Sequence, residues 1–154
     1  MIAALLQRAR AQGVTIATAE SCTRGMVSAA LTDIAGSSDV FDRGFVTYSN
    51  AAKTAMLGVQ AQTLDTYGAV SEPAAAQMAE GALAQSNASL AVSITGIAGP
   101  GGSDFKPEGR VCFGLAQTGK PTQVETVEFG ALGRAGVRAA ARDRALALLA
   151  QALG

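Results

Sequence analysis

Val14-Thr-Ile-Ala-Thr-Ala-Glu-Ser-Cys-Thr-Arg-Gly25, with the nine residues after it, is the stretch that decides the fold class. Residues 14–19 predict a short strand, and the apolar residues of 26–34 recur at helical spacing. The polar turn 20–25 joins these two elements. A strand, a short turn and a helix in this order form the repeating unit of α/β proteins with parallel sheets.

Helices and strands alternate on both sides of this unit. A helix is predicted over 2–12 with Gly13 as its stop, Asn50 is the expected N-cap of a later helix, and Ser71 with Pro73 starts another. The remaining strands are predicted at 40–47, 90–97, 111–116 and 124–129, and the remaining helices at 51–57, 62–67, 71–84 and 135–153. This order predicts one domain, 1–154, with the α/β class of fold: a three-layer α/β/α sandwich around a mostly parallel mixed sheet.

The composition is that of an apolar domain without net charge. Of 154 residues, 49% are hydrophobic and 16% charged, and 12 basic residues balance 12 acidic ones. This balance gives no general attraction to nucleic acid or to an anionic membrane, and the neutral surface favours a homo-oligomer. No segment has the pattern of a signal peptide or of a membrane span, so a reduced cytoplasmic protein is expected.

The absence of histidine limits the chemistry most strongly. With no histidine in the chain, Ser-His-Asp and Cys-His catalysis and histidine metal sites are excluded. Cys22 and Cys112 are the only cysteines and cannot build a four-thiolate zinc site. Acid–base chemistry must therefore use Lys, Tyr, Cys, Asp or Glu, and we expect neither a metal nor a cofactor.

Three predicted strand ends are polar or glycine-rich: residues 20–23, 47–50 and 95–102. In open α/β sheets, ligands bind at the carboxyl ends of the strands. If these ends converge, they form one pocket that contains a serine, a tyrosine, a lysine and a glycine-rich wall.

Ser21 is the candidate nucleophile at the first of these ends. At the start of a helix, the N–H groups of Cys22 and Thr23 would be free to bind an oxyanion beside it. Lys53 is the candidate base, because a first-turn position and burial both favour the neutral amine. The alternative interpretations are that Ser21 only caps the helix and that Lys53 is a solvated surface residue.

Other residues of these segments allow two interpretations each. Tyr48 either acts on Lys53, by relaying a proton between Ser21 and Lys53 or by holding the lysine, or fills space at a strand end. The glycine-rich segment 95–102 either approaches a ligand with its backbone or forms a plain tight loop. The arginines at 134, 138 and 142 lie one turn apart and form either a solvated helix face or a surface that binds phosphate or a partner.

Taken together, five segments of the chain resemble the CinA C-terminal domain family: Ala19-Glu-Ser-Cys-Thr-Arg-Gly, Leu31-Thr-Asp-Ile-Ala-Gly-Ser-Ser, Arg43-Gly-Phe-Val-Thr-Tyr-Ser-Asn, Ala69-Val-Ser-Glu and Thr95-Gly-Ile-Ala-Gly-Pro-Gly-Gly. The resemblance implies the same three-layer sandwich, homo-oligomers, and metal-free hydrolysis of nicotinamide mononucleotide to nicotinate mononucleotide and ammonia. It also places the family's serine, tyrosine and lysine on Ser21, Tyr48 and Lys53.

The complete expected site adds donors and substrate contacts to these three catalytic residues. Cys22 and Thr23 are expected to bind the oxyanion through their backbone. The expected substrate contacts are Glu20, Arg24, Thr95, Gly96, Gly99, Gly101 and Gly102. The glycine-rich loop would hold the ribose phosphate through its backbone amides.

The chain departs from the family pattern at three points. Arg24 stands where the family usually has glycine, and it would either contact the substrate phosphate or obstruct the pocket. Leu132-Gly133-Arg134 keeps the arginine of a Gly-Asp-Arg motif and lacks its aspartate. The N-terminal domain of longer family members is not expected here, nor is its separate nucleotide hydrolase chemistry. Two other functions stay open: a non-catalytic nucleotide-binding or regulatory module, and a serine amidase for another small amide.

Overall fold

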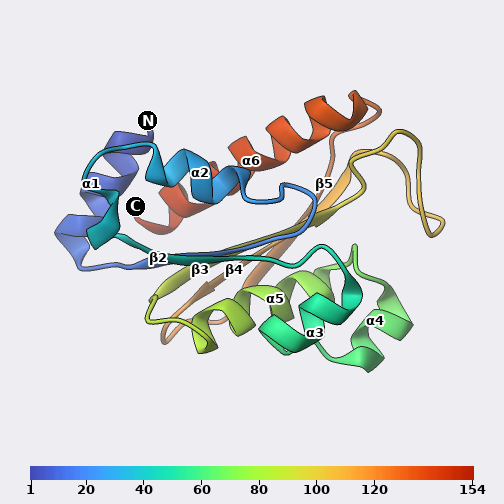
Figure 1. Ribbon diagram of the computed structural model, residues 1–154, viewed down its shortest axis with the longest axis horizontal. Helices are drawn as coiled ribbons and strands as arrows, with labels where there is room; N and C mark the ends of the chain where they lie inside the picture. The colour runs from blue at the N-terminus through green and yellow to red at the C-terminus, as the bar shows by residue number, and fades with distance from the viewer.

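Five strands form one mixed sheet in the order β2-β1-β3-β4-β5 in the computed structural model, which describes residues 1–154 (Figure 1). The strands are β1 (Ile16–Glu20), β2 (Phe41–Val46), β3 (Leu90–Gly96), β4 (Arg110–Gln117) and β5 (Gln123–Glu128). β1 pairs in parallel with β2 and β3, whereas β4 is antiparallel to both β3 and β5. Four of the five strands therefore run in one direction, and the prediction of a mostly parallel mixed sheet is confirmed.

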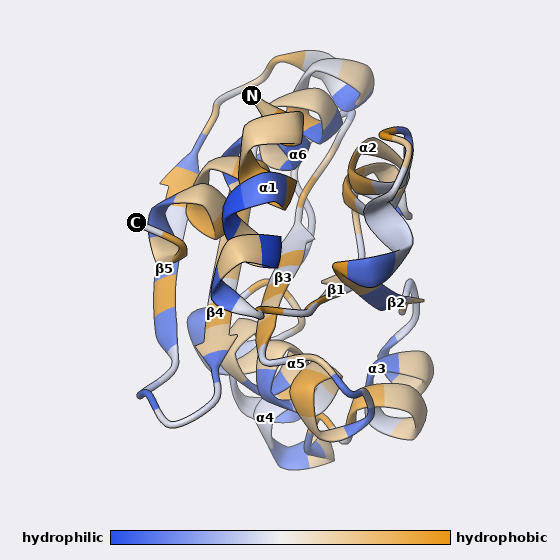
Figure 2. Cartoon of the chain, turned by 90° about the vertical axis from the view of Figure 1, so that its left-hand side faces the viewer, coloured by the Kyte–Doolittle hydropathy of each residue, from blue (hydrophilic) through white to orange (hydrophobic).

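Helices cover both faces of this sheet (Figures 1 and 2). One layer contains α1 (Ile2–Gln12), α2 (Met26–Thr32) and α6 (Gly133–Ala152), and the other contains α3 (Asn50–Leu57), α4 (Ala61–Tyr67) and α5 (Glu72–Ala84). A short 3₁₀ helix, η1 (Ser37–Asp39), replaces the turn predicted before β2. The predicted three-layer sandwich is confirmed.

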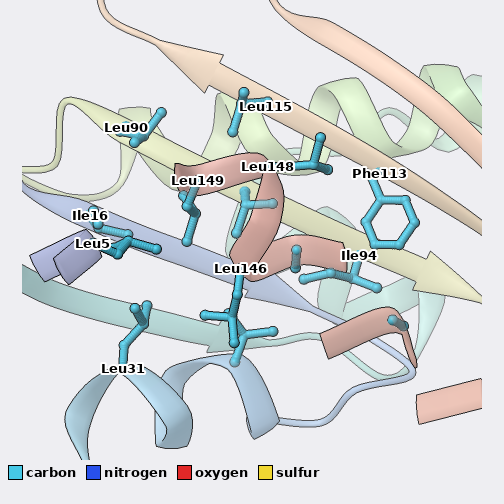
Figure 3. Packing of buried hydrophobic residues seen from close by; sticks show 14 of the residues in the cluster. Leu5, Ile16, Leu31, Leu90, Ile94, Phe113, Leu115, Leu146, Leu148 and Leu149 are labelled. Carbon is cyan, nitrogen blue, oxygen red and sulfur yellow. The ribbon is translucent and has the colours of Figure 1, made fainter. Parts of the chain in front are cut away.

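The main core lies between the sheet and the layer of α1, α2 and α6. Its members include Leu5, Leu31, Phe113 and Leu149, which are fully buried and are spread along the layer between the helices and the sheet (Figure 3). Burial of one such side chain is worth about 1.5–3 kcal/mol. The opposite layer packs through smaller residues, for example Ala82 of α5, so the long α6 is held mainly by leucines and α5 mainly by close approach to the sheet.

Most element boundaries fall within two residues of the sequence prediction, but one predicted cap is wrong. The hydroxyl of Ser49, not the side chain of Asn50, caps α3 by accepting a hydrogen bond from the Ala52 N–H at 3.0 Å. Asn50 is the first helical residue, and its side chain is thus free for another role. The predicted cap Ser71 is confirmed, since its Oγ accepts from the Ala74 N–H.

The topology brings the three polar strand ends to one edge. Because β1, β2 and β3 are parallel neighbours, the turns that follow them leave the sheet on the same side. The long loop between β3 and β4 also stays at this edge, and it projects beyond the sheet as the yellow segment in Figure 1. None of the helices has the length and apolar character that crossing a membrane requires.

Candidate active site

The three strand ends enclose a pocket of about 280 Å³ at this edge. It is lined by Ser21, Cys22, Tyr48, Asn50, Lys53, Ala69, Val70, Thr95, Gly96, Ala98 and Arg134. Six of the residues expected at the site thus line one cavity: Ser21, Cys22, Tyr48, Lys53, Thr95 and Gly96. A larger groove of about 990 Å³ between α1, α2 and α6 is mostly apolar and contains no serine or lysine.

Ser21 and Lys53 form a direct hydrogen bond in this pocket. The Lys53 Nζ donates to Ser21 Oγ at 3.1 Å and to the Thr47 carbonyl oxygen at 2.9 Å. Lys53 is 1% exposed and forms no ion pair with a carboxylate. Burial lowers the pKa of Lys53, and the first-turn position in α3 acts in the same direction. A neutral lysine amine at this distance can take the serine proton.

The turn after β1 contains two backbone donors without an acceptor, at Cys22, which lines the pocket, and at the fully buried Thr23, which does not. The N–H of Ser21 itself is bonded to the Ile94 carbonyl, whereas the N–H groups of Cys22 and Thr23 have no acceptor in the protein. These donors belong to a turn and not to a helix, because α2 begins only at Met26. The expectation that Ser21 caps or starts a helix is therefore wrong, while the expected pair of free N–H groups is present.

Glu20 does not face the pocket, and its expected contact with substrate is wrong. Its side chain is fully buried and accepts hydrogen bonds from the hydroxyls of Thr23 and Ser28 and from the N–H groups of Gly25, Val27 and Ser28. The carboxylate thus satisfies the free donors at the start of α2. It holds the turn that carries Ser21.

Cys22 lines the pocket beside Ser21 but is not a competing nucleophile. Burial raises the pKa of the Cys22 thiol to about 11. The thiol is therefore protonated at neutral pH, and the thiolate is the reactive form of cysteine. The Ser21 hydroxyl therefore stays the candidate nucleophile of this pocket.

Tyr48 is not placed between Ser21 and Lys53, so its expected role as a proton relay is wrong. Its side chain is exposed at the mouth of the pocket, and its Oη accepts a hydrogen bond from Arg134 Nη2 at 3.0 Å. The guanidinium carbon of Arg24 lies 5.6 Å from the centre of its ring. Tyr48 therefore interacts with two arginines, whereas the hydrogen bond between Lys53 and Ser21 is direct.

The far half of the glycine-rich loop does not cradle an anion as expected. Gly101 and Gly102 are exposed and do not line the pocket. The Gly101 N–H donates to one oxygen of the Glu108 carboxylate at 2.7 Å, and the Gly133 N–H donates to the other at 2.9 Å. An internal carboxylate thus takes the place that a phosphate would need, and it ties the loop to the start of α6.

The near half of the loop forms a pocket wall. The Thr95 hydroxyl donates to the Ala69 carbonyl at 2.9 Å and so fixes the segment before α5. Gly96 lines the pocket, whereas Gly99 contributes its carbonyl oxygen, which accepts from Arg134 Nη1 at 2.7 Å. Of the expected glycine contacts, only Gly96 faces the pocket directly.

Two arginines of α6 belong to the site, so the interpretation of these residues as a solvated helix face is wrong for both. Arg134 lines the pocket, and Arg138 Nε donates to the Cys22 carbonyl at 3.0 Å. Only Arg142 of the three fits the solvated interpretation, because it pairs with Asp143. The spacing of one turn placed the first two on one face, but nothing in the sequence showed that this face meets the pocket.

Arg24 lies at the mouth of the pocket, in the turn before α2. It precedes the helix, is exposed, and has a positive φ of 47°. L-residues rarely adopt this conformation, which glycine adopts without strain. The backbone geometry therefore explains why glycine suits this position.

The fold and the pocket together define a class: a three-layer α/β protein with a serine and a buried lysine at the carboxyl edge of its parallel strands. The chain belongs to the CinA C-terminal domain family, whose sequence pattern matches residues 1–153. It is 59% identical over 111 residues to the nicotinamide-nucleotide amidohydrolase PncC of Escherichia coli K12, a match that covers 71% of this chain and 67% of that protein.

Two further relatives extend this comparison. A CinA-like protein of Chlorobium phaeobacteroides BS1 is 56% identical over 121 residues, which are 77% of this chain and 29% of that protein. Among solved structures, the competence/damage inducible protein CihA of Agrobacterium tumefaciens is 48% identical with a TM-score of 0.90, covering 99% of this chain and 94% of that one. The chain thus matches less than a third of the longer CinA-like relative.

Proposed function

We propose that this protein hydrolyses the carboxamide of nicotinamide mononucleotide, with Ser21 as nucleophile and Lys53 as base. The observation that carries the proposal is the 3.1 Å hydrogen bond between Lys53 Nζ and Ser21 Oγ inside a pocket. The substrate follows from the similarity to PncC, which is a nicotinamide-nucleotide amidohydrolase. The products are nicotinate mononucleotide and ammonia.

In the first step, Ser21 Oγ attacks the carboxamide carbon while neutral Lys53 takes its proton. The backbone carbonyl of Thr47 orients the amine by accepting its second hydrogen bond. Because no carboxylate pairs with Lys53, its ammonium form lacks the ion pair that would stabilise it most strongly before the attack. The lowered pKa of Lys53 increases the fraction of neutral amine that can act as a base.

The oxyanion that forms then accepts hydrogen bonds from the N–H groups of Cys22 and Thr23. These groups have no other acceptor, so they are available when the charge develops. One such backbone donor lowers the barrier by about 3–4 kcal/mol. Their positions depend on Glu20, which holds Thr23 and Gly25 from behind.

Collapse of the intermediate breaks the carbon–nitrogen bond, and the Lys53 ammonium gives its proton to the departing amide nitrogen, which leaves as ammonia. Water then attacks the Ser21 ester with Lys53 again as base, which releases the carboxylate product and restores the serine. Every proton in this sequence moves through Lys53, so Tyr48 has no part in proton transfer. No metal or cofactor is needed.

The test is release of ammonia from nicotinamide mononucleotide by the wild type and by Ser21→Ala and Lys53→Ala. Both variants are expected to lose turnover while keeping the circular dichroism spectrum of the wild type. Matched controls are Ser37→Ala, a buried serine outside the pocket, and Lys120→Ala, a lysine outside it. Both controls are expected to keep full activity.

Three results would contradict the proposal. A near-native rate for Lys53→Ala at pH 7 would exclude the lysine as base. Equal release of ammonia from asparagine would favour a serine amidase for other small amides. Tight binding of the nucleotide without any turnover by the wild type would favour a non-catalytic nucleotide-binding module.

A further inference from the structure

Three of the four arginines that form no ion pair lie around one pocket. Five of the nine arginines form ion pairs with Asp or Glu: Arg10, Arg43, Arg110, Arg142 and Arg144. Of the other four, Arg24, Arg134 and Arg138 surround the site of Ser21 and Lys53, and only Arg8 lies elsewhere. No Asp or Glu lines this pocket. In a chain with zero net charge, such an arrangement favours an anionic ligand.

Arg134 is held at the pocket by neutral partners only. Its Nη1 donates to the Gly99 carbonyl at 2.7 Å and its Nη2 to the Tyr48 hydroxyl at 3.0 Å. A guanidinium has five N–H groups, so three remain for a ligand. The carboxylate of Glu108 is engaged by the amides of Gly101 and Gly133 and forms no ion pair with Arg134. Arg134 thus keeps its charge uncompensated and its orientation fixed.

Arg24 reaches the same tyrosine from the face of its ring. Its guanidinium carbon lies 5.6 Å from the ring centre, a cation–π distance, and it has no hydrogen-bond acceptor in the protein. Its positive φ is a strained conformation for an L-residue. Both the turn geometry and the stacking on Tyr48 hold this side chain at the mouth of the pocket.

We propose that Arg24 and Arg134, positioned by Tyr48, clamp the phosphate monoester of the substrate at the mouth of the pocket. This inference rests on the proposed function and specifies which part of the substrate is recognised. Each planar guanidinium can donate two parallel hydrogen bonds to a phosphate. Arg138 is not part of the clamp, because its Nε holds the Cys22 carbonyl. The clamp selects a phosphorylated nucleotide over the corresponding riboside or the free base.

Binding of ribose 5-phosphate tests the clamp without requiring catalysis. We expect calorimetric titration to show binding to the wild type that weakens as salt is added. Loss of a charged hydrogen-bonding partner should weaken binding about 10-fold or more for Arg134→Gln and about 3-fold or more for the exposed Arg24→Gln. Arg8→Gln removes an unpaired charge elsewhere and is expected to bind as the wild type does. Thermal unfolding of each variant confirms that it is folded.

Steady-state kinetics provide a second, independent test of the same clamp. Arg24→Gly is expected to raise the KM for nicotinamide mononucleotide and to leave any slow hydrolysis of nicotinamide riboside unchanged. Wild-type affinity for ribose 5-phosphate in both Arg24→Gln and Arg134→Gln, or no binding by the wild type, would overturn the clamp. A several-fold gain in nucleotide turnover by Arg24→Gly would show instead that this arginine obstructs the pocket. If ribose 5-phosphate binds as expected but ammonia is not released, the proposed hydrolysis fails and the clamp stands.

Discussion

Replacement of Glu20 by glutamine is expected to lower both the stability of the fold and the kcat of ammonia release. The buried carboxylate accepts three hydrogen bonds at Oε1 (from Thr23 Oγ1, Gly25 N–H and Val27 N–H) and two at Oε2 (from the N–H and the hydroxyl of Ser28). Glutamine keeps the most bonds when its carbonyl oxygen takes the place of Oε1. Its amide group then faces the Ser28 N–H, while the Ser28 hydroxyl can turn to accept.

One backbone donor therefore loses its acceptor in this variant. Loss of a hydrogen bond to a charged group costs about 1.5–3 kcal/mol. The three bonds that remain are also weaker, because their acceptor is no longer charged. For a domain of this size, 1 kcal/mol shifts Tm by about 2–4 °C. The expected fall in Tm for Glu20→Gln is thus about 3–12 °C.

The assay is thermal unfolding at pH 7, followed by ammonia release well below Tm. The Glu20 carboxylate accepts hydrogen bonds from Thr23 and Gly25 of the turn as well as from the first residues of α2. We therefore expect kcat to fall together with Tm. Glu80→Gln is the matched control, since Glu80 is an exposed carboxylate on α5 that accepts only from Thr122. A Tm for Glu20→Gln within about 1 °C of the wild type would refute this account of the turn, and a normal kcat in a destabilised variant would refute its link to catalysis.

Two further predictions concern Lys53 and metal ions. Burial lowers the pKa of Lys53 below 10.5. Between that lowered pKa and pH 10.5, the unfolded chain therefore binds more protons than the folded one. In this range the free energy of unfolding rises with pH through this lysine, by at most about 1.4 kcal/mol per pH unit. Urea unfolding from pH 7 to 10.5 should show that Lys53→Met lacks this rise, and an identical pH dependence in both proteins would count against a neutral buried amine. The rate of ammonia release should be unchanged in excess EDTA, because the proposed nucleophile and base are both side chains of this protein. A complete loss of ammonia release that a divalent ion restores would contradict this prediction.

The sequence was sufficient to predict the fold and the central pair of the pocket. The strand of residues 14–19, its polar turn and the following helix gave a unit whose geometry is almost invariant, so the parallel sheet followed from local pattern. Ser21 and Lys53 could be chosen because both follow strands and because the chain has no histidine. Their actual contact depends on the neighbouring positions of β1 and β2 in the sheet.

The wrong predictions about the site share one physical origin: they depend on the direction in which a side chain points. Whether Glu20 points into the pocket or back toward α2 is decided by which donors surround it, and these donors come from a turn whose shape no periodicity describes. Arg134 and Tyr48 are 86 residues apart in the chain, so their contact arises from packing alone. The contacts of Glu108 also arise from packing, because its two backbone N–H partners lie in the glycine-rich loop and at the start of α6.

The bond from Arg138 to the Cys22 carbonyl joins residues 116 positions apart. Closing a chain segment of this length costs more conformational entropy than forming a local contact does. The turn that carries Ser21 thus receives its final support only when α6, packed through its leucines, has reached the sheet. A refolding chain would regain its helical spectrum before its turnover, and the lag between the two signals would measure the time that α6 takes to dock.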